Sequence, residues 1–372
     1  MKNRFIKLFF ALLLVVITTL SAYAFSFRNM TLDFIHISDT HISVDRDDTS
    51  YKALSSSSFL LQDAIEQINQ IKGLDFVLFT GDMVDSATLN NYREYYSLLS
   101  KLKYPSLNTF GNHDVAYGDL TKEEVLELVK NSNKNYTFDG TYYAFSPKTD
   151  YRIIVLDSTT DNDKSANGSL SSEQLAFLDL ELSENQDKIV VIALHVPPVE
   201  PFVSTEHSLV NADDFNEILL KYKNPIVILS GHYHAAKIRH WGNLVYVSTP
   251  SMVTYPMAFR HIKITNYKDR VTFKFDFIPT RLEKIKEQNK SSVISYGTLA
   301  GCEKDRDYSF IYNKRHPKSS SFKRNKIKNA TKNKVSKREI KKLERQQLKE
   351  DNKVKENKKN RLFKKKNKTV TD

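Results

Sequence analysis

The stretch Asp75–Asp85, which reads DFVLFTGDMVD, constrains the fold more than any other segment of the chain. Phe76–Phe79 form a short apolar run, as expected for a strand that is buried on both faces. Gly81 then allows a tight turn, and Asp82 follows it directly. A buried carboxylate without a partner is very unfavourable. Taken alone, Asp82 is best explained as the cap of a turn or helix.

Four other segments repeat this arrangement, in which an apolar run ends in a cluster of polar residues. Periodic apolar residues predict helices over Ser55–Lys72 and Asn90–Lys103, so that strands and helices alternate. Functional sites of α/β sheets form at the carboxyl ends of the strands. We therefore expect the polar clusters to converge on one edge. They follow the predicted strands Thr31–Ser38, Ser106–Phe110, Lys188–Leu194 and Pro225–Ser230.

The residue types in these clusters predict a metal centre, because stability alone would favour apolar contacts at such strand ends. Two ions about 3.5–4 Å apart need many ligands and a bridging carboxylate. Oxygen donors mixed with imidazoles suit Mn²⁺, Fe or Zn²⁺ better than Ca²⁺ or Mg²⁺. We therefore expect two divalent metal ions as cofactors. The candidate ligands are Asp39, His41, Asp82, Asn112, His195, His232 and His234.

The order of the motifs resembles that of the calcineurin-like metallophosphoesterase family, over about Thr31–Pro279. The sequence around His195, with Pro197-Pro198 after it, is most similar to the branch that contains bacterial cyclic-nucleotide phosphodiesterases. The resemblance implies an α/β fold: a four-layer αββα sandwich of two mixed β-sheets flanked by helices. Separately, alternating polarity predicts that a second sheet is built from Leu244–Ser248, Ala258–Thr265 and Arg270–Phe277.

The resemblance also implies a role for each ligand. Asp82 would bridge the two ions, and a hydroxide shared by the ions would attack the phosphorus of the ester. The remaining ligands divide into two sets. Asp39, His41 and His234 would hold one ion, and Asn112, His195 and His232 the other.

Catalytic roles are implied for two residues that are not ligands. His113 would protonate the leaving alcohol or stabilise the phosphoryl charge, and Asp114 would orient His113. Asp85 would support the loop at Gly81. Purple acid phosphatases of the same superfamily have a tyrosine at the position of Asp85. Two divalent ions are therefore expected rather than a ferric-tyrosinate centre.

The predicted function is metal-dependent hydrolysis of a phosphate ester, with a phosphodiester as the first choice. A phosphomonoesterase or nucleotidase is the alternative, and an inactive phosphoesterase-fold binding protein is a third. The loops Val199–Leu209 and Thr249–Met257 are expected to select the substrate. Arg260 is either a contact to the substrate phosphate or a surface residue.

The remaining histidines have simpler explanations. His36 lies inside the first predicted strand and is expected to be a hydrogen-bonded core or surface residue. His207 and His240 are expected to be loop or surface residues.

The N-terminal residues predict export. Basic residues precede the apolar run Leu8–Leu20, and Ala22-Tyr23-Ala24 places small residues where a signal peptidase reads. Residues 1–24 are therefore expected to be a signal peptide, or else an uncleaved membrane anchor. The protein would be periplasmic, extracellular or anchored at the membrane. Cys302 is the only cysteine, which excludes an internal disulfide.

The rest of the chain is expected to consist of a catalytic domain, a C-terminal extension and a basic tail. Residues 25–280 are expected to form the catalytic domain and 281–315 a C-terminal extension, with a short helix at Arg281–Lys290 and Tyr308–Tyr312 docked on the body. Residues 316–372 carry 22 Lys and Arg against 6 Asp and Glu, although the formal charge of the whole chain is only +12. This low-complexity tail is expected to be disordered. It is either a solvated segment or an electrostatic anchor to an anionic envelope surface or nucleic acid. No protein partner is inferable.

Overall fold

The computed structural model describes residues 30–160, 165–204 and 206–314, together with Phe9, Leu13, Leu14 and Val16. The chain divides into the units Met1–Lys328 and Asn329–Asp372, and all of the described residues belong to the first. The predictions for 316–372, and for 1–24 apart from those four residues, therefore lie outside the described residues. Within the described part of the chain, no helix has the length and apolar character needed to cross a bilayer.

One six-stranded sheet has the order β12-β11-β10-β1-β2-β3. Its strands β1, β2 and β3 are parallel, and the register pairs Ile37 with Phe79 and Phe79 with Asn108. The carboxyl ends of the three parallel strands are therefore level. The strands are β1 (Thr31–Ile37), β2 (Phe76–Thr80), β3 (Ser106–Thr109), β10 (Ala258–Asn266), β11 (Arg270–Pro279) and β12 (Tyr308–Asn313).

The other six-stranded sheet has the order β4-β5-β6-β7-β9-β8. Its central strands β5, β6, β7 and β9 are parallel, and β4 and β8 pair antiparallel at the edges. Its strands are β4 (Tyr143–Phe145), β5 (Tyr151–Val155), β6 (Ile189–Ala193), β7 (Ile226–Ser230), β8 (Lys237–Trp241) and β9 (Leu244–Ser248).

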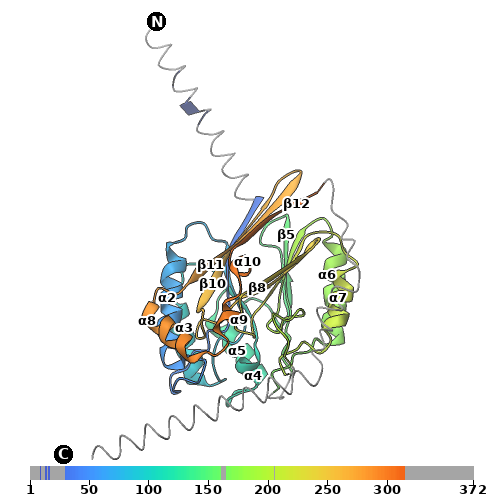
Figure 1. Cartoon of the computed structure of the whole chain (residues 1–372). Coiled ribbons are helices and arrows are strands. Elements are labelled where there is room, and N and C mark those ends of the chain that lie inside the picture. Colours follow the sequence, from blue (N-terminus) through green and yellow to red (C-terminus); the bar gives the residue numbers. More distant parts are fainter. Residues whose placement is uncertain are drawn as a thin grey trace, which may run out of the picture. The chain divides into compact units, whose positions relative to one another are not determined.

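Helices cover the outer faces of both sheets, as Figure 1 shows: α2, α3 and α8 lie on one side of the molecule, and α6 and α7 lie on the other. Buried apolar residues of both sheets, such as Phe34, Val191 and Val227, belong to one continuous core. The predicted four-layer sandwich is confirmed. The helices are η1 (Leu54–Ser56), α2 (Ser57–Gln70), α3 (Leu89–Leu99), α4 (Asn112–Val115), α5 (Lys122–Ser132), α6 (Ser172–Glu184), α7 (Ala212–Leu219), α8 (Glu283–Ser292), α9 (Tyr296–Ala300) and α10 (Glu303–Arg306).

The prediction that Leu244–Ser248, Ala258–Thr265 and Arg270–Phe277 share one second sheet is wrong. β9 lies beside β7, whereas β10 and β11 extend the sheet of β1. Alternating polarity identifies a strand but not its neighbour, since the neighbour depends on tertiary packing. The same limit explains β8, which the sequence did not predict: all five of its residues are half-buried, so no clear alternation marks it.

The helices α5 and α6 begin with different capping arrangements. Helix α5 starts with a capping box, in which Thr121 and Glu124 are bonded reciprocally. In α6, Ser171 accepts from Gln174 N, but the Gln174 side chain bonds the backbone of Asp157.

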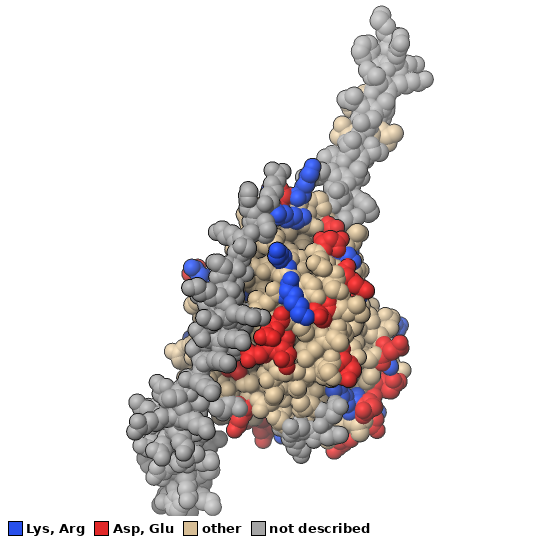
Figure 2. All heavy atoms as spheres, turned by 90° about the vertical axis from the view of Figure 1, so that its right-hand side faces the viewer, with Lys and Arg blue, Asp and Glu red and all other residues tan. Residues whose placement is uncertain are grey.

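Residues 281–314 are integrated into the fold. The predicted helix is α8, and Tyr308–Tyr312 lie in β12, which pairs antiparallel with β11. Figure 2 shows the face that carries α6 and α7, where acidic and basic side chains are interspersed over the described surface. The mixed charge of this face contrasts with the excess of basic residues in 316–372.

Candidate metal centre

The seven candidate ligands lie together, but they come from both sheets rather than from one edge. Asp39 and His41 follow β1, Asp82 follows β2, and Asn112 begins α4 after β3. The other three follow β6 and β7 in the second sheet. The loops of the two sheets are joined directly, because His232 N donates to Asp39 Oδ2 over 3.0 Å. The expectation of a single sheet edge is therefore wrong, although the convergence is confirmed.

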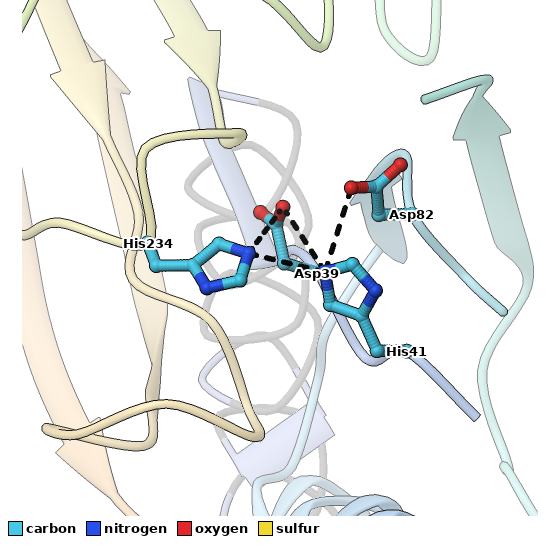
Figure 3. A group of neighbouring side chains, drawn as sticks. All are labelled: Asp39, His41, Asp82 and His234. Atoms are coloured by element: carbon cyan, nitrogen blue, oxygen red, sulfur yellow. Dashed lines mark hydrogen bonds and ion pairs between the residues drawn. The ribbon is translucent and has the colours of Figure 1, made fainter. Parts of the chain in front are cut away.

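The first group contains Asp39, His41, Asp82 and His234, whose ligating atoms point toward one another (Figure 3). His234 Nε2 lies 3.1 Å from His41 Nε2 and 3.3 Å from Asp39 Oδ1. His41 Nε2 lies 3.4 Å from Asp82 Oδ2 and 3.9 Å from Asp39 Oδ1. Bonds of about 2.0–2.2 Å to a common ion place neighbouring donors roughly 3–3.6 Å apart. The spacing therefore fits a single cation among these four residues.

The second group has Asn112, His195 and His232 around the same aspartate. His195 Nε2 lies 3.2 Å from Asn112 Oδ1, 3.0 Å from His232 Nδ1 and 3.4 Å from Asp82 Oδ2. Asp82 Oδ2 is therefore equally far from His41 in the first group and from His195 in the second. This carboxylate is in the position that a bridging ligand requires.

Hydrogen bonds behind the imidazoles fix which nitrogen faces each group. His195 Nδ1 donates to Thr80 O over 2.7 Å, which leaves Nε2 for a cation. His234 Nδ1 lies 2.8 Å from Thr254 Oγ1, with the same consequence. His232 instead presents Nδ1, and its buried Nε2 has no hydrogen-bond partner within the described chain. Such outer contacts are typical of histidines that bind metals.

Backbone strain is concentrated at the same residues. Non-glycine residues with positive φ are uncommon, and each costs about 1–3 kcal/mol where the surroundings enforce it. Outside the candidate ligands, Met257 is the one such residue in the part of the chain that the structure describes. Folding alone does not account for this clustering. The strained ligands are Asp39, His41, Asp82, His232 and His234, with φ from 42° to 69°.

Two glycines make room for the carboxylates. A Cβ at position 231 would lie 1.9 Å from Ser38 Oγ and 2.3 Å from Asp39 Oδ2. A Cβ at position 111 would lie 2.2 Å from Asp82 Oδ1. Any side chain at Gly111 or Gly231 would therefore displace a candidate ligand, and the donors present fit divalent cations in number, type and spacing.

His113 lies beside the first group, close to His41 and Asp85. Its Nδ1 donates to Asp85 O over 2.7 Å, and its backbone N–H donates to Asp82 Oδ1 over 2.9 Å. The ring stacks on Tyr117 with the centroids 4.7 Å apart, and the side chain is 21% exposed. His113 is therefore held rigidly at the edge of the centre, where a substrate can reach it.

The structure exchanges the supporting roles that were expected for Asp85 and Asp114. The Asp114 carboxylate accepts hydrogen bonds from Gly111 N, Met83 N and Val84 N, so it supports the loop that follows Gly81. Asp85, through its carbonyl group, is the residue that orients His113. The expected assignment was wrong because the side chain of Asp114 turns back toward the start of its own short helix.

Lys52 is the main residue of the site that the sequence did not reveal. Its buried ammonium group lies 3.0 Å from Asp85 Oδ1, 3.2 Å from His41 Nδ1 and 3.4 Å from His113 Nε2. One carboxylate oxygen and the nitrogen atoms of two imidazoles thus surround this ammonium group. Nothing in the sequence distinguishes this lysine, which lies in an irregular loop.

The contacts of Arg260 and His36 show the roles of these two residues. Arg260 is completely buried and donates to the carbonyl oxygens of Ser248, Asp305 and Arg306, so it is neither a surface residue nor free to bind phosphate. His36 is a buried residue bonded to two threonines, as expected.

His240 and His207 differ in their distance from the candidate metal centre. His240 is half-buried in β8, where its Nδ1 bonds Tyr308. His207 lies in a loop, as expected, but its ring is only 5.2 Å from that of His232.

Electrostatics agree with a site that is built for cations. Burial and the charge of Lys52 lower the pKa of His41 to about 3, which keeps this imidazole neutral. Burial alone would raise the pKa of Asp85, but His41 and Lys52 hold it well below its usual range. Burial would lower the pKa of His195, yet the Asp82 carboxylate outweighs it and raises the pKa to about 9. The carboxylates of Asp82 and Asp85 thus stay ionised, and their negative charge favours a bound cation.

Comparison with known proteins agrees with this geometry. A sequence model of the calcineurin-like phosphoesterase domain matches residues 32–236. A probable glycerophosphodiester phosphodiesterase of Arcobacter nitrofigilis is 27% identical over 224 residues, which are 58% of this chain and 77% of that protein. A 3′,5′-cyclic-nucleotide phosphodiesterase of Nostoc sp. is 26% identical over 227 residues, or 60% of this chain and 79% of that protein.

Two further similar proteins are an enzyme whose name states its metal and a protein of known structure. A manganese-dependent ADP-ribose/CDP-alcohol diphosphatase of Arabidopsis thaliana is 29% identical over 226 residues, covering 48% of this chain and 71% of that protein. The crystal structure of a dimetal phosphatase from Danio rerio superposes with a TM-score of 0.56 at 19% identity and covers 67% of this chain and 99% of that one, which shows the fold. The chain therefore belongs to the calcineurin-like phosphoesterase family, whose members are hydrolases of phosphate esters.

Proposed function

We propose that the protein hydrolyses a phosphodiester at a centre of two divalent metal ions that share Asp82. One observation carries the proposal: Asp82 Oδ2 lies 3.4 Å from His41 Nε2 and 3.4 Å from His195 Nε2, which belong to different ligand groups. Two groups that meet at one carboxylate oxygen are expected for a pair of ions, and not for two independent sites.

Mn²⁺, Fe or Zn²⁺ fits the donors best, because carboxylate and amide oxygens are mixed with imidazole nitrogens. The manganese dependence in the name of the Arabidopsis relative supports Mn²⁺ as the first ion to test. When bound, such ions lower the pKa of a water molecule and neutralise charge on a phosphoryl group. Asp39, His41 and His234 would hold one ion, and Asn112, His195 and His232 the other.

His113 would act on the leaving group. Because Nδ1 donates to the Asp85 carbonyl group, Nε2 is the nitrogen at which the ring can exchange a proton with a substrate. Stacking on Tyr117 restricts the orientation of the ring. A proton held at Nε2 would be transferred to the oxygen of the departing alcohol as the P–O bond breaks.

We propose a diester as the substrate, and not a monoester, because several relatives bear phosphodiesterase names. The loops that were expected to select the substrate do border the site. His207 lies beside His232, and Thr254 contacts His234. A phosphomonoesterase or nucleotidase remains the second candidate function, since the ligand groups prepare a nucleophile without choosing its target.

The test compares bis(p-nitrophenyl) phosphate with p-nitrophenyl phosphate as substrates of the Mn²⁺-loaded protein. Faster turnover of the diester supports the proposal. Faster turnover of the monoester moves the function to a phosphatase with the same centre. Stoichiometric Mn²⁺ binding without turnover of either ester would contradict the proposed hydrolysis of simple phosphodiesters and favour a binding protein.

We further propose that the protein is exported and that the tail 316–372 binds anionic surfaces, on the basis of the N-terminal apolar run and the 22 basic residues of the tail. Binding of the full chain to vesicles with anionic lipid should weaken steeply as salt rises. Binding that did not change with salt would contradict the electrostatic role of the tail.

A further inference from the structure

Helix α8 lies in the C-terminal extension, beyond the residues 32–236 that match the family. Its Ile285, together with Leu282, packs against a small apolar cluster that is separate from the main core. The cluster joins the loops on either side of the first ligand group, and Ala53 N also donates to Val253 O over 2.8 Å. Its buried members are Ala53, Leu54, Leu60, Val253 and Met257.

Asn289 of α8 connects the same two loops by hydrogen bonds. Its side-chain Nδ2 donates to Tyr51 O over 3.0 Å, and its Oδ1 accepts from Tyr255 N over 2.7 Å. The partners settle the orientation of the amide, since a carbonyl oxygen only accepts and a backbone N–H only donates. The side chain is almost fully buried, with 6% of its surface exposed.

The two peptide groups that Asn289 holds adjoin residues that contact metal ligands. Tyr51 O belongs to the peptide group that leads into Lys52, whose Nζ lies 3.2 Å from His41 Nδ1. Tyr255 N belongs to the peptide group that follows Thr254, whose Oγ1 lies 2.8 Å from His234 Nδ1. His41 and His234 are the two imidazoles of the first group, with their Nε2 atoms 3.1 Å apart.

We infer that Asn289 is a positioning residue for the first metal ion, and that the C-terminal extension therefore completes the centre. Through Lys52 and Thr254 it fixes the separation of His41 and His234. The inference rests on the proposed function, because it assumes that these imidazoles share a cation. Outer contacts of this kind typically change metal affinity by about 10–100-fold. The imidazoles of the second group are held by other contacts, so the effect is confined to one ion.

The test is a titration of the metal-stripped full chain with Mn²⁺, in which calorimetry and electron paramagnetic resonance measure the binding. Asn289→Ala should weaken one of the two Mn²⁺ equivalents by about 10–100-fold and leave the other unchanged. The weakened equivalent should be the one that His234→Ala removes, and not the one that Asn112→Ala removes. Asn289→Asp should also weaken it, because its second oxygen cannot donate to Tyr51 O.

A matched control separates positioning from general stability. Asn133 is 5% exposed, and its amide also makes two backbone hydrogen bonds, to Ser106 O and from Asn135 N, each 3.0 Å long. Asn133→Ala should lower the melting temperature about as much as Asn289→Ala but leave both Mn²⁺ affinities unchanged.

Three results would overturn the inference. Wild-type affinity for both equivalents in Asn289→Ala would show that Asn289 has only a structural role. Equal weakening of both equivalents in Asn289→Ala and Asn133→Ala would mean that lost stability explains the effect. Failure of the wild-type protein to bind two equivalents of Mn²⁺ would remove the proposed function together with the inference.

Discussion

The ammonium group of Lys52 lies 3.0 Å from the carboxylate of Asp85, and both groups are almost completely buried. Asp85 Oδ1 is also 3.2 Å from His41 Nδ1, the nitrogen that carries the proton when Nε2 binds a cation. The pair thus adds no net charge beside the candidate metal centre and supports His41 and His113 on the side away from it.

Replacing Lys52 with Met keeps the length of the side chain and removes its charge. Asp85 would then be buried without its strongest counter-ion, and turnover of the diester should fall by about 10–100-fold, with a lower melting temperature. Arg46→Met is the matched control. Arg46 contacts the other oxygen of Asp85, but its side chain is 56% exposed, so the loss should be within a few-fold. Equal losses in both variants would contradict a special role for Lys52.

Replacing His113 with Ala should lower kcat by about 10²–10⁴-fold while Mn²⁺ binding stays at the wild-type stoichiometry. The reason is that His113 contacts the ligand Asp82 only through its backbone N–H, which the alanine variant retains. Kinetics and a metal analysis of the same sample check both parts. Loss of Mn²⁺ along with activity would show that the histidine is needed for metal binding instead.

Replacing Asp114 with Ala should destabilise the fold more than it changes the chemistry. Three backbone N–H groups would lose their acceptor, and each buried donor left unpaired costs about 1–3 kcal/mol. A drop of at least about 3 kcal/mol in the free energy of unfolding is expected from denaturation by urea. Asp114→Asn, which keeps one acceptor oxygen, should lose less. An unchanged unfolding midpoint in Asp114→Ala would be inconsistent with this structural role.

Metal binding by the second group should depend on pH. The pKa of His195 is raised to about 9 in the protein without ions, so both nitrogens of the imidazole carry a proton at pH 7. A cation must displace one of these protons, and the affinity should therefore rise about tenfold per pH unit between pH 6 and 9, then level off. Calorimetry in buffers of different ionisation enthalpy should detect the release of about one proton at pH 7.5. A pH-independent affinity would contradict the exchange of a proton for a cation at His195.

The ligand residues could be predicted from the sequence because each stands directly after a strand that is recognisable from its apolar run. Gly111 and Gly231 directly precede two of these residues, and the structure shows that a side chain there would collide with a carboxylate. The family resemblance then ordered the same residues around two ions, and in the structure they form two groups that meet at Asp82.

The supporting residues could not be predicted, because their roles depend on side-chain directions in irregular turns. Asp85 and Asp114 lie three and two residues after Asp82 and Asn112, and nothing in that spacing indicates which of them orients His113. Lys52 and Asn289 are distant in sequence from any motif and reach the site only through tertiary contacts. The place of β9 in the second sheet depends on such contacts as well.

The most direct test of the central claim is the Mn²⁺ stoichiometry of Asp82→Asn, measured beside its turnover of bis(p-nitrophenyl) phosphate. An amide in place of the shared carboxylate leaves each ligand group without its common negative charge. The account predicts that the wild-type chain binds two Mn²⁺ ions, that Asp82→Asn retains one or none, and that diester turnover is lost. Two tightly bound ions and wild-type turnover in Asp82→Asn would contradict the account.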